Sequence, residues 1–214
     1  MIRAYRWPDW PSQPVWPVAL GYRDLWLTPF SSRDTDEWLR LRAVNAAWLA
    51  PWEATAPGPA QAYGTPRQRI RALGRSAKAG QCLPWLIRVG PEPGGRLVGQ
   101  CTVSNIVYGS GQFASIGYWV ARADAGRGIV PQAVAMATDY AMTVVGLHRI
   151  EICIRPENAA SLRVVDKLGF REEGLRPRFL HIAGAWADHR VFALTREEIP
   201  HGLLLQVEAP RSSR

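Results

Sequence analysis

The sequence predicts a single domain of the α+β class, in which a mixed and mostly antiparallel sheet is flanked by helices. Three consecutive segments with strand-like apolar patterns, 83–89, 96–107 and 115–121, are joined by short glycine-rich turns, which favours antiparallel pairing. The third segment leads through a glycine-rich break into a long apolar helix, and a strand at 148–154 follows. A right-handed crossover sets this last strand parallel to the one at 115–121.

Length and composition favour one domain with two flanking segments. The chain has 214 residues, 47% of them apolar, but no stretch approaches the ~20 apolar residues of a membrane span. We expect a Pro/Trp-rich extension at 1–20, the main domain at 21–195, and a C-terminal tail at 196–214 that is frayed from its first residue onward.

Cysteine usage and the N-terminal sequence indicate a reducing compartment. The three cysteines, Cys82, Cys101 and Cys153, are odd in number and widely spaced in apolar surroundings, which favours buried free thiols over disulfides or a metal site. The first twenty residues lack the continuous apolar core of a signal peptide. We therefore expect a cytoplasmic protein without a membrane anchor.

The remaining elements follow from caps, apolar spacing and turn residues. Ser31 or Ser32 is expected to cap a helix whose Trp38, Leu39 and Leu41 face inward. The other expected elements are a strand at 21–28, helices at 44–49, 66–79 and 158–168, and strands at 170–182 and 185–194.

The stretch from Ile116 to Ala137 contains the strongest functional signal. Its strand ends at a break that contains Gly126-Arg127-Gly128, and a helix starts directly after the break. Glycines let the backbone approach a ligand, and the free N–H groups and positive dipole end of a helix favour an anion such as phosphate. A tight strand-to-helix turn explains the same residues equally well. The apolar helix face is formed by Ile129, Ala133, Met136, Ala137, Tyr140 and Val144.

The charge balance favours an anionic partner. The formal net charge is +8, and only Lys78 and Lys167 are lysines, so arginine dominates. Such a balance attracts nucleic acid, a ribosome surface or a phosphorylated cofactor. One face of the helix at 66–79 is basic, and either a solvated face or an RNA-docking surface accounts for it. This face carries Arg67, Arg71, Arg75 and Lys78.

With these motifs in order, the chain resembles the Gcn5-related N-acetyltransferases (GNAT), and more narrowly their RimJ/RimL branch, which acetylates protein amino termini. The resemblance covers about residues 20–195 and rests on five segments: LWLTPFSSRDTDEWLRLR, LAPWE, IGYWV with the glycine break, RPENAASLRVVDKLGF and GAWADHRVFAL. It implies the GNAT acyl-CoA N-acyltransferase fold, with a splayed parallel strand pair, and acetyl-CoA as co-substrate.

The resemblance also assigns the cofactor-binding residues. The break aligns with the family's pyrophosphate-binding loop, although Ala125 and Val130 depart from its usual polar and small residues. The preceding strand is expected to pair with the pantetheine arm through main-chain hydrogen bonds, and Asn158 to touch a pantetheine amide while also capping its helix. The residues so assigned are Tyr118, Trp119, Val120, Gly126, Arg127, Gly128, Ile129, Val130 and Asn158.

The same resemblance implies one catalytic role, and position along the chain suggests a base. Ser161 is expected to protonate the departing thiolate, because the helix lacks the tyrosine that the family often places there. Glu53, beside a long loop at 54–66 that is either disordered or a substrate-facing lid, is the first candidate for a base, and Asp188 is the second. A surface carboxylate and a turn residue explain these two candidates for the base equally well, and water alone suffices for an α-amine. The histidines have no partner at a catalytic spacing, and no metal-ligand cluster or nucleophile motif is visible, which favours direct attack by an amine.

Three functions remain open at this point. The first is acetyl transfer to the N-terminal α-amino group of a ribosomal or other protein, by a monomer or homodimer whose basic surface contacts the ribosome or its RNA. The second is transfer to a small amine such as an aminoglycoside or polyamine. The third is a non-catalytic acyl-CoA-binding or RNA-associated module, for which Ala125 and Val130 are the support.

Overall fold

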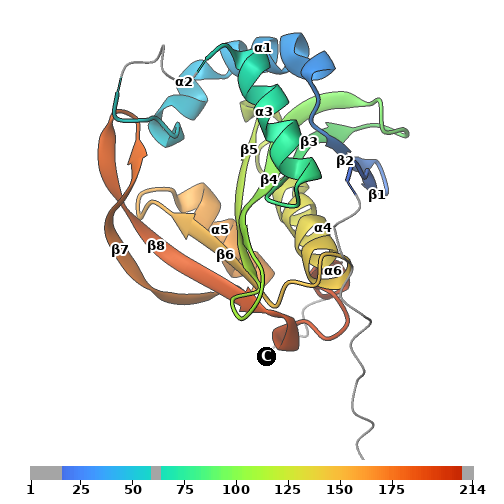
Figure 1. Cartoon of the computed structure of the whole chain (residues 1–214), viewed down its shortest axis with the longest axis vertical. Helices are drawn as coiled ribbons and strands as arrows, with labels where there is room; N and C mark the ends of the chain where they lie inside the picture. The colour runs from blue at the N-terminus through green and yellow to red at the C-terminus, as the bar shows by residue number, and fades with distance from the viewer. Residues whose placement is uncertain (1–15, 59–63, 209–214) are drawn as a thin grey trace, which may run out of the picture.

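The computed structural model describes residues 16–58 and 64–208, and in this part of the chain one eight-stranded sheet carries helices on both faces (Figure 1). The strand order is β1-β2-β3-β4-β5-β6-β8-β7, and every neighbouring pair is antiparallel except β5 and β6. The strands are β1 (Leu20–Tyr22), β2 (Leu25–Pro29), β3 (Leu83–Val89), β4 (Arg96–Val107), β5 (Phe113–Val120), β6 (Arg149–Ile154), β7 (Arg171–Ile182) and β8 (Ala185–Thr195). This arrangement confirms the expected mixed and mostly antiparallel sheet.

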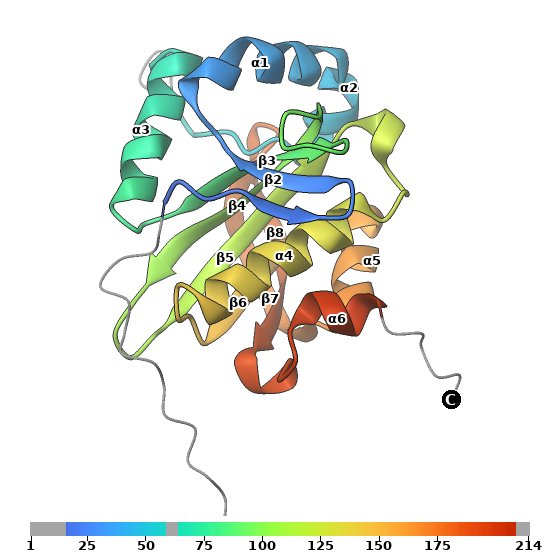
Figure 2. The same cartoon turned by 90° about the vertical axis from the view of Figure 1, so that its right-hand side faces the viewer.

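The helices divide between the two faces of the sheet (Figure 2). They are α1 (Thr35–Val44), α2 (Ala46–Leu49), α3 (Pro66–Lys78), α4 (Ile129–Thr143), α5 (Ala159–Leu168) and α6 (Leu203–Glu208). Neighbouring residues of β3 show the division, because side chains alternate between the faces of a strand. Trp85 packs edge-on against Tyr140 of α4 (5.7 Å between ring centroids), whereas Leu86 belongs to a smaller cluster with Ile70 of α3.

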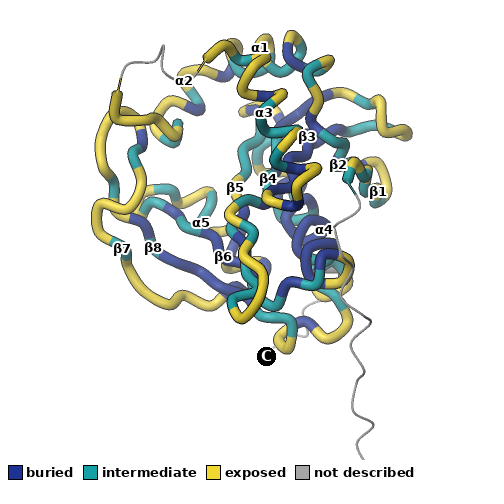
Figure 3. Tube along the Cα trace, viewed as in Figure 1, coloured by how far each residue is buried: buried dark blue, intermediate teal, exposed yellow. Residues whose placement is uncertain are grey.

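Helix α4 forms the centre of the larger core, and Figure 3 shows it as a mostly buried segment. Ile129, Ala133, Met136 and Tyr140 are buried as their spacing predicts. Val144 is 38% exposed instead of buried, because the helix ends at Thr143 and the next residue, Val145, is the one buried in the core. No helix within the described ranges combines the length and apolarity needed to cross a bilayer.

Three expectations, on one strand, one side chain and the C-terminal segment, are wrong. The segment at 21–28 is a hairpin of β1 and β2 rather than one strand, because the chain turns at Arg23, which has φ +52°. Leu39 of α1 is 38% exposed instead of facing inward. The chain after Arg196 is not frayed as far as residue 208: it forms α6, whose Leu203 is fully buried, and the Arg196 guanidinium donates to Leu147 O (2.8 Å).

The two parallel strands separate along their length. Phe113–Ser115 of β5 pair with Arg149–Glu151 of β6, and no pairing continues beyond these residues. The expected splayed pair is therefore present. Its open end leads toward the glycine break on one side and toward α5 on the other, and this gap positions the site.

Candidate active site

The glycine break forms an open loop at the N-terminus of α4. Gly126 (φ +76°) and Gly128 (φ +78°) both lie in the left-handed region, and nothing lies within 4 Å of a Cβ built at either position. The amides of residues 126–130 have no hydrogen-bond partner among the described residues, and no side chain caps the helix. Val130 is 9% exposed and packs into the core, so its size does not narrow the loop. Free amides on an open loop suit a diphosphate.

A buried carboxylate organises the arginines beside this loop. Asp124 is 2% exposed and accepts two hydrogen bonds from Arg96 (2.7 and 2.9 Å) and one from Arg127 (3.2 Å). The hydrogen bond from Arg96 is the largest influence on the pKa of Asp124 and lowers it, and Arg127 acts in the same direction. Burial raises this pKa but does not outweigh them, so the pKa stays below its usual value. Both guanidinium groups remain more than half exposed beside the loop, where they can face a phosphate.

Beyond the pairing with β6, β5 offers main-chain groups to a ligand. The Ala121 amide donates to Val98 O in β4 (2.8 Å). Because main-chain groups alternate in direction along a strand, those of Tyr118 and Val120 face the other way, into the gap beside β6. There the Val120 carbonyl already accepts from the indole Nε1 of Trp48 (3.1 Å). The Val120 amide and both main-chain groups of Tyr118 remain for an extended arm such as pantetheine.

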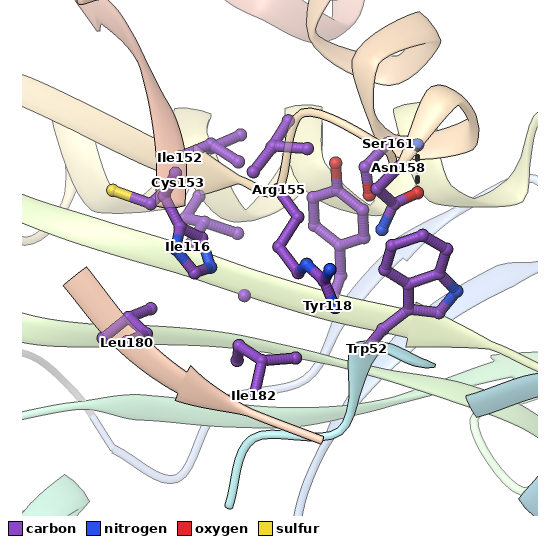
Figure 4. Close-up of a pocket in the computed structure, with 13 residues that line it drawn as sticks. Trp52, Ile116, Tyr118, Ile152, Cys153, Arg155, Asn158, Ser161, Leu180 and Ile182 are labelled. Carbon is purple, nitrogen blue, oxygen red and sulfur yellow. Dashed lines mark hydrogen bonds between the residues drawn. The ribbon is translucent and has the colours of Figure 1, made fainter. Parts of the chain in front are cut away.

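A cleft of about 150 Å³ lies at the open end of the splayed pair (Figure 4). Its walls come from strands β5, β6, β7 and β8, helix α5 and the turn at Trp52, and most of the side chains are apolar. Tyr118, Asn158 and Ser161 line the cleft at its α5 end, and Leu180 and Ile182 of β7 line the other end. Trp52 and His189 also line the cleft. The cleft is of a size to hold the acetyl end of a thioester and the first atoms of an acceptor.

Tyr118, Asn158 and Ser161 meet at one end of this cleft (Figure 4). Asn158 caps α5, since its Oδ1 accepts from the Ser161 amide (3.0 Å), and Gly169 (φ +73°) ends the helix as expected. The Tyr118 hydroxyl is buried and forms no hydrogen bond of normal geometry with the described residues. Burial raises its pKa far above the usual value, an effect that the nearby Ser161 side chain opposes. The hydroxyl is therefore protonated and available as a donor.

A short strap, residues 53–55, is hydrogen-bonded to the hairpin of β7 and β8 next to the cleft. The Ala183 amide donates to Glu53 O (2.8 Å), and the Thr55 amide donates to His181 O (2.9 Å). The Gly184 amide donates to Thr55 Oγ1 (3.0 Å). The first residues of the expected lid are thus fixed to the turn between β7 and β8, whereas residues 59–63 lie outside the described residues.

Neither carboxylate expected to act as a base lines the cleft. Glu53 forms an ion pair with Arg42, whose guanidinium lies over the rings of Trp38 (4.9 Å) and Trp119 (5.3 Å). Asp188 Oδ1 accepts from the Arg178 amide (2.7 Å). The roles assigned to these two carboxylates stay predictions.

Sequence reasoning missed three residues near the site. Arg96 and Asp124 carry no recognisable motif and meet only through the fold. His189 was visible in the sequence without a partner, and the structure places it in the cleft wall, 3% exposed. Among the described residues no group of three histidine, cysteine or acidic side chains is arranged to hold a metal ion.

Comparison with known proteins identifies the family. Residues 24–171 match the model of the acetyltransferase (GNAT) domain. The chain is 30% identical over 166 residues to the [ribosomal protein uS5]-alanine N-acetyltransferase of Escherichia coli, covering 76% of this chain and 84% of that protein. The chain belongs to the GNAT acetyltransferase family.

Further relatives agree with this assignment. The solved structure of Mycobacterium smegmatis RimJ in complex with CoA-disulfide is 36% identical, with a TM-score of 0.81 over 92% of this chain and 96% of that one. The probable N-acetyltransferase YjcK of Bacillus subtilis is 41% identical over 99 residues. This alignment covers 46% of the present chain and about half (55%) of the length of that relative.

This GNAT protein is thus an N-acetyltransferase, and the M. smegmatis RimJ structure that it resembles contains CoA-disulfide. The residues of the present chain fit CoA: the open loop has free amides for the diphosphate, and the splayed strands leave main-chain groups for the pantetheine arm. The assignment of Ile129 to cofactor binding rests on its free amide, because its side chain is in the core. Trp119 pairs with Gln100 of β4 and its indole donates to the Gln100 side chain (3.3 Å), so its role in cofactor binding stays a prediction.

Proposed function

We propose that this GNAT enzyme acetylates the α-amino group at the N-terminus of a protein, and that the acceptor is a ribosomal protein. The E. coli relative is a ribosomal-protein uS5-alanine N-acetyltransferase, and M. smegmatis RimJ has a very similar fold. A ribosomal acceptor would also place the enzyme in the cytoplasm.

The observation that carries the proposal is the chemistry of the cleft wall. No aspartate or glutamate lines the cleft in the described part of the chain, and Arg155 does line it. A polyamine or aminoglycoside carries several positive charges and needs carboxylates to bind it. A protein N-terminus offers one amine on a neutral main chain, which matches a small and largely apolar cleft.

The attack itself needs little help from the enzyme. An α-amino group has a pKa near ~7.7–8.0, whereas the pKa of a lysine amine is near ~10.4, so a useful fraction of α-amine is neutral at pH 7. The strap limits access to the cleft, which favours the end of an unfolded chain over a folded surface. The hydroxyl groups of Ser161 and Tyr118 line the same cleft, and we propose that they donate to the departing sulfur.

The test is a transfer assay with two sets of acceptors. Acetyl-CoA is supplied with peptides that begin with Ala, Ser, Thr or Met, and separately with spermidine and kanamycin. We expect acetylation at the peptide α-amine. Transfer confined to the small amines would replace this proposal with the second function, and CoA binding without transfer to any acceptor would favour the non-catalytic alternative.

The basic face of α3 is the surface we propose for contact with ribosomal RNA. Arg71, Arg75 and Lys78 of this face are exposed and have no ion-pair partner among the described residues, while Arg67 pairs with Asp36 (2.8 Å). An RNA contact of this kind depends on salt. Replacing these three unpaired cations with glutamine should weaken sedimentation with small ribosomal subunits at low salt and leave peptide acetylation intact. Unchanged sedimentation would show that the face is only solvated.

A further inference from the structure

His189 is a buried histidine in the cleft wall with no role so far. It lies on β8 and is 3% exposed, and it borders the same 150 Å³ cavity as Tyr118 and Ser161. The two hydroxyls belong to the α5 end of the cavity, and the imidazole comes from the hairpin that the strap contacts. The thioester and the acceptor amine must meet between these walls.

Two contacts fix the ring and its tautomer. Nδ1 lies 2.9 Å from Ala187 O, and a carbonyl oxygen can only accept, so Nδ1 carries the hydrogen. In a neutral ring Nε2 is then a lone-pair acceptor. The ring of Phe179 packs edge-on against the imidazole at 6.0 Å with an interplanar angle of 74°, which holds the ring in place.

The surroundings keep this imidazole neutral. Burial is the largest cause that lowers the pKa of His189 below its usual 6.5, and the positive charge of Arg155 acts in the same direction. The Ala187 carbonyl, Asp188 and Glu157 oppose the shift without reversing it. From the neighbouring strands, Arg176 of β7 lies opposite His189 and Cys153 of β6 lies in the same cleft wall.

We propose that Nε2 of His189 accepts the proton released by the acceptor amine during acetyl transfer. This inference rests on the proposed function. The neutral amine attacks the thioester carbonyl carbon with its lone pair, and the nitrogen becomes positively charged as the C–N bond forms. Its proton passes to Nε2, the C–S bond breaks with its electron pair on sulfur, and the thiolate takes a proton from the hydroxyl end of the cleft. After product release the histidine loses its proton to solvent, and the hydroxyl that protonated the thiolate regains one from solvent, so the net proton balance is zero.

His189 fits this role better than the two carboxylates predicted from the sequence. Glu53 and Asp188 are held by Arg42 and by the Arg178 amide, and neither lines the cleft. Within residues 16–58 and 64–208 no group is hydrogen-bonded to Nε2 of His189, and its Nδ1 already donates to Ala187 O. A general base of this kind contributes ~10²–10⁴-fold to rate.

The test compares His189→Asn and His189→Ala with a matched control, His148→Gln. The asparagine amide can keep the bond to Ala187 O while it removes the basic nitrogen. His148 pairs with Glu197 (3.0 Å) at the other end of β6 and borders no part of the cleft. Acetyl transfer to peptides beginning with Ala is measured at saturating acetyl-CoA, together with the Kd for CoA as a test of folding.

We expect both His189 variants to bind CoA within twofold of the parent and to lose about 100-fold in kcat with little change in KM. Added imidazole should raise the kcat of His189→Ala at least tenfold, because removal of the ring leaves space that is open to the cleft. His148→Gln should match the parent. A kcat within threefold of the parent in both His189 variants, or a loss that Glu53→Gln alone reproduces, would overturn the inference.

An independent readout uses the free enzyme. Nitrogen NMR of labelled histidine should show His189 at pH 7 as a neutral ring with the hydrogen on Nδ1; a hydrogen on Nε2 or a charged ring would contradict the proposal. Failure of the parent enzyme to acetylate any peptide would instead contradict the proposed function, so the two failures are distinguishable.

Discussion

Replacing Gly128 with valine should separate phosphate binding from folding, because the chain offers a matched control in Gly109. Both glycines lie in the left-handed region, Gly128 at φ +78° and Gly109 at φ +70°, and nothing lies within 4 Å of a Cβ at either position. The cost to stability therefore comes from the backbone alone, about 1–2 kcal/mol for each left-handed residue. Both variants should show a similar fall in the free energy of unfolding.

The effect on CoA binding should differ between the two sites. A valine at 128 shifts the loop and places a side chain where the diphosphate would lie, at the point where residues 126–130 present free amides. A hydrogen bond to a charged group contributes about 1.5–3 kcal/mol, so loss of one or two of them predicts a Kd raised about 100-fold. Gly109, in the turn between β4 and β5, should leave the Kd within twofold.

The assay is isothermal titration calorimetry with CoA, run beside thermal unfolding of both variants. Normal affinity in Gly128→Val would refute the placement of the loop. An equal loss of affinity in Gly109→Val would show that the effect is a general loss of stability and not a local one.

Three further changes test other parts of the account. Ser161→Ala should lower kcat at least tenfold and leave the CoA Kd within twofold, as measured by single-turnover kinetics and calorimetry; an unchanged rate would remove Ser161 from the mechanism. Asp124→Asn should weaken CoA binding severalfold and lower the free energy of unfolding by about 1–3 kcal/mol. Folding lowers the pKa of the Asp124 carboxyl below 3.8. The difference in unfolding free energy between the parent and Asp124→Asn should therefore be complete above pH 3.8 and vanish as the pH falls through the lowered pKa. Acid unfolding of both proteins measures this difference. Leu203→Ala should lower the free energy of unfolding, measured in urea, by about 2–4 kcal/mol. An unchanged free energy of unfolding would show that α6 does not pack stably on the domain.

The parts of the fold that the sequence predicts well are those with local signals. The turns around β3 and β4 contain glycine and proline, and α5 has both its asparagine cap and its terminal glycine, so the bounds of these elements agree closely with the structure. The turn of the β1–β2 hairpin has no such signal, because an arginine takes the left-handed position there. Helix α6 is stabilised by contacts with α4 that no local pattern reports.

The candidate site likewise has parts with local sequence signals and parts without them. The glycine break and the Asn158 cap are local motifs, and the structure places them where the sequence predicts. The Arg96–Asp124 pair joins the start of β4 to the segment that follows β5. The cleft is lined by both Tyr118 and His189, which are 71 positions apart. No spacing along the chain predicts either arrangement. The ion pair that holds Glu53 is likewise a product of packing between α1 and the strap.

The central claim is that free amides at the start of α4 hold a diphosphate and so place a thioester beside Ser161. A crystal structure of the protein with CoA tests it most directly. The account predicts diphosphate oxygens within hydrogen-bonding distance of the amides of residues 126–130, and the pantetheine arm along Tyr118 and Val120 with its sulfur in the 150 Å³ cleft. Density for the diphosphate elsewhere on the protein, with the gap between β5 and β6 closed by side chains, would contradict it.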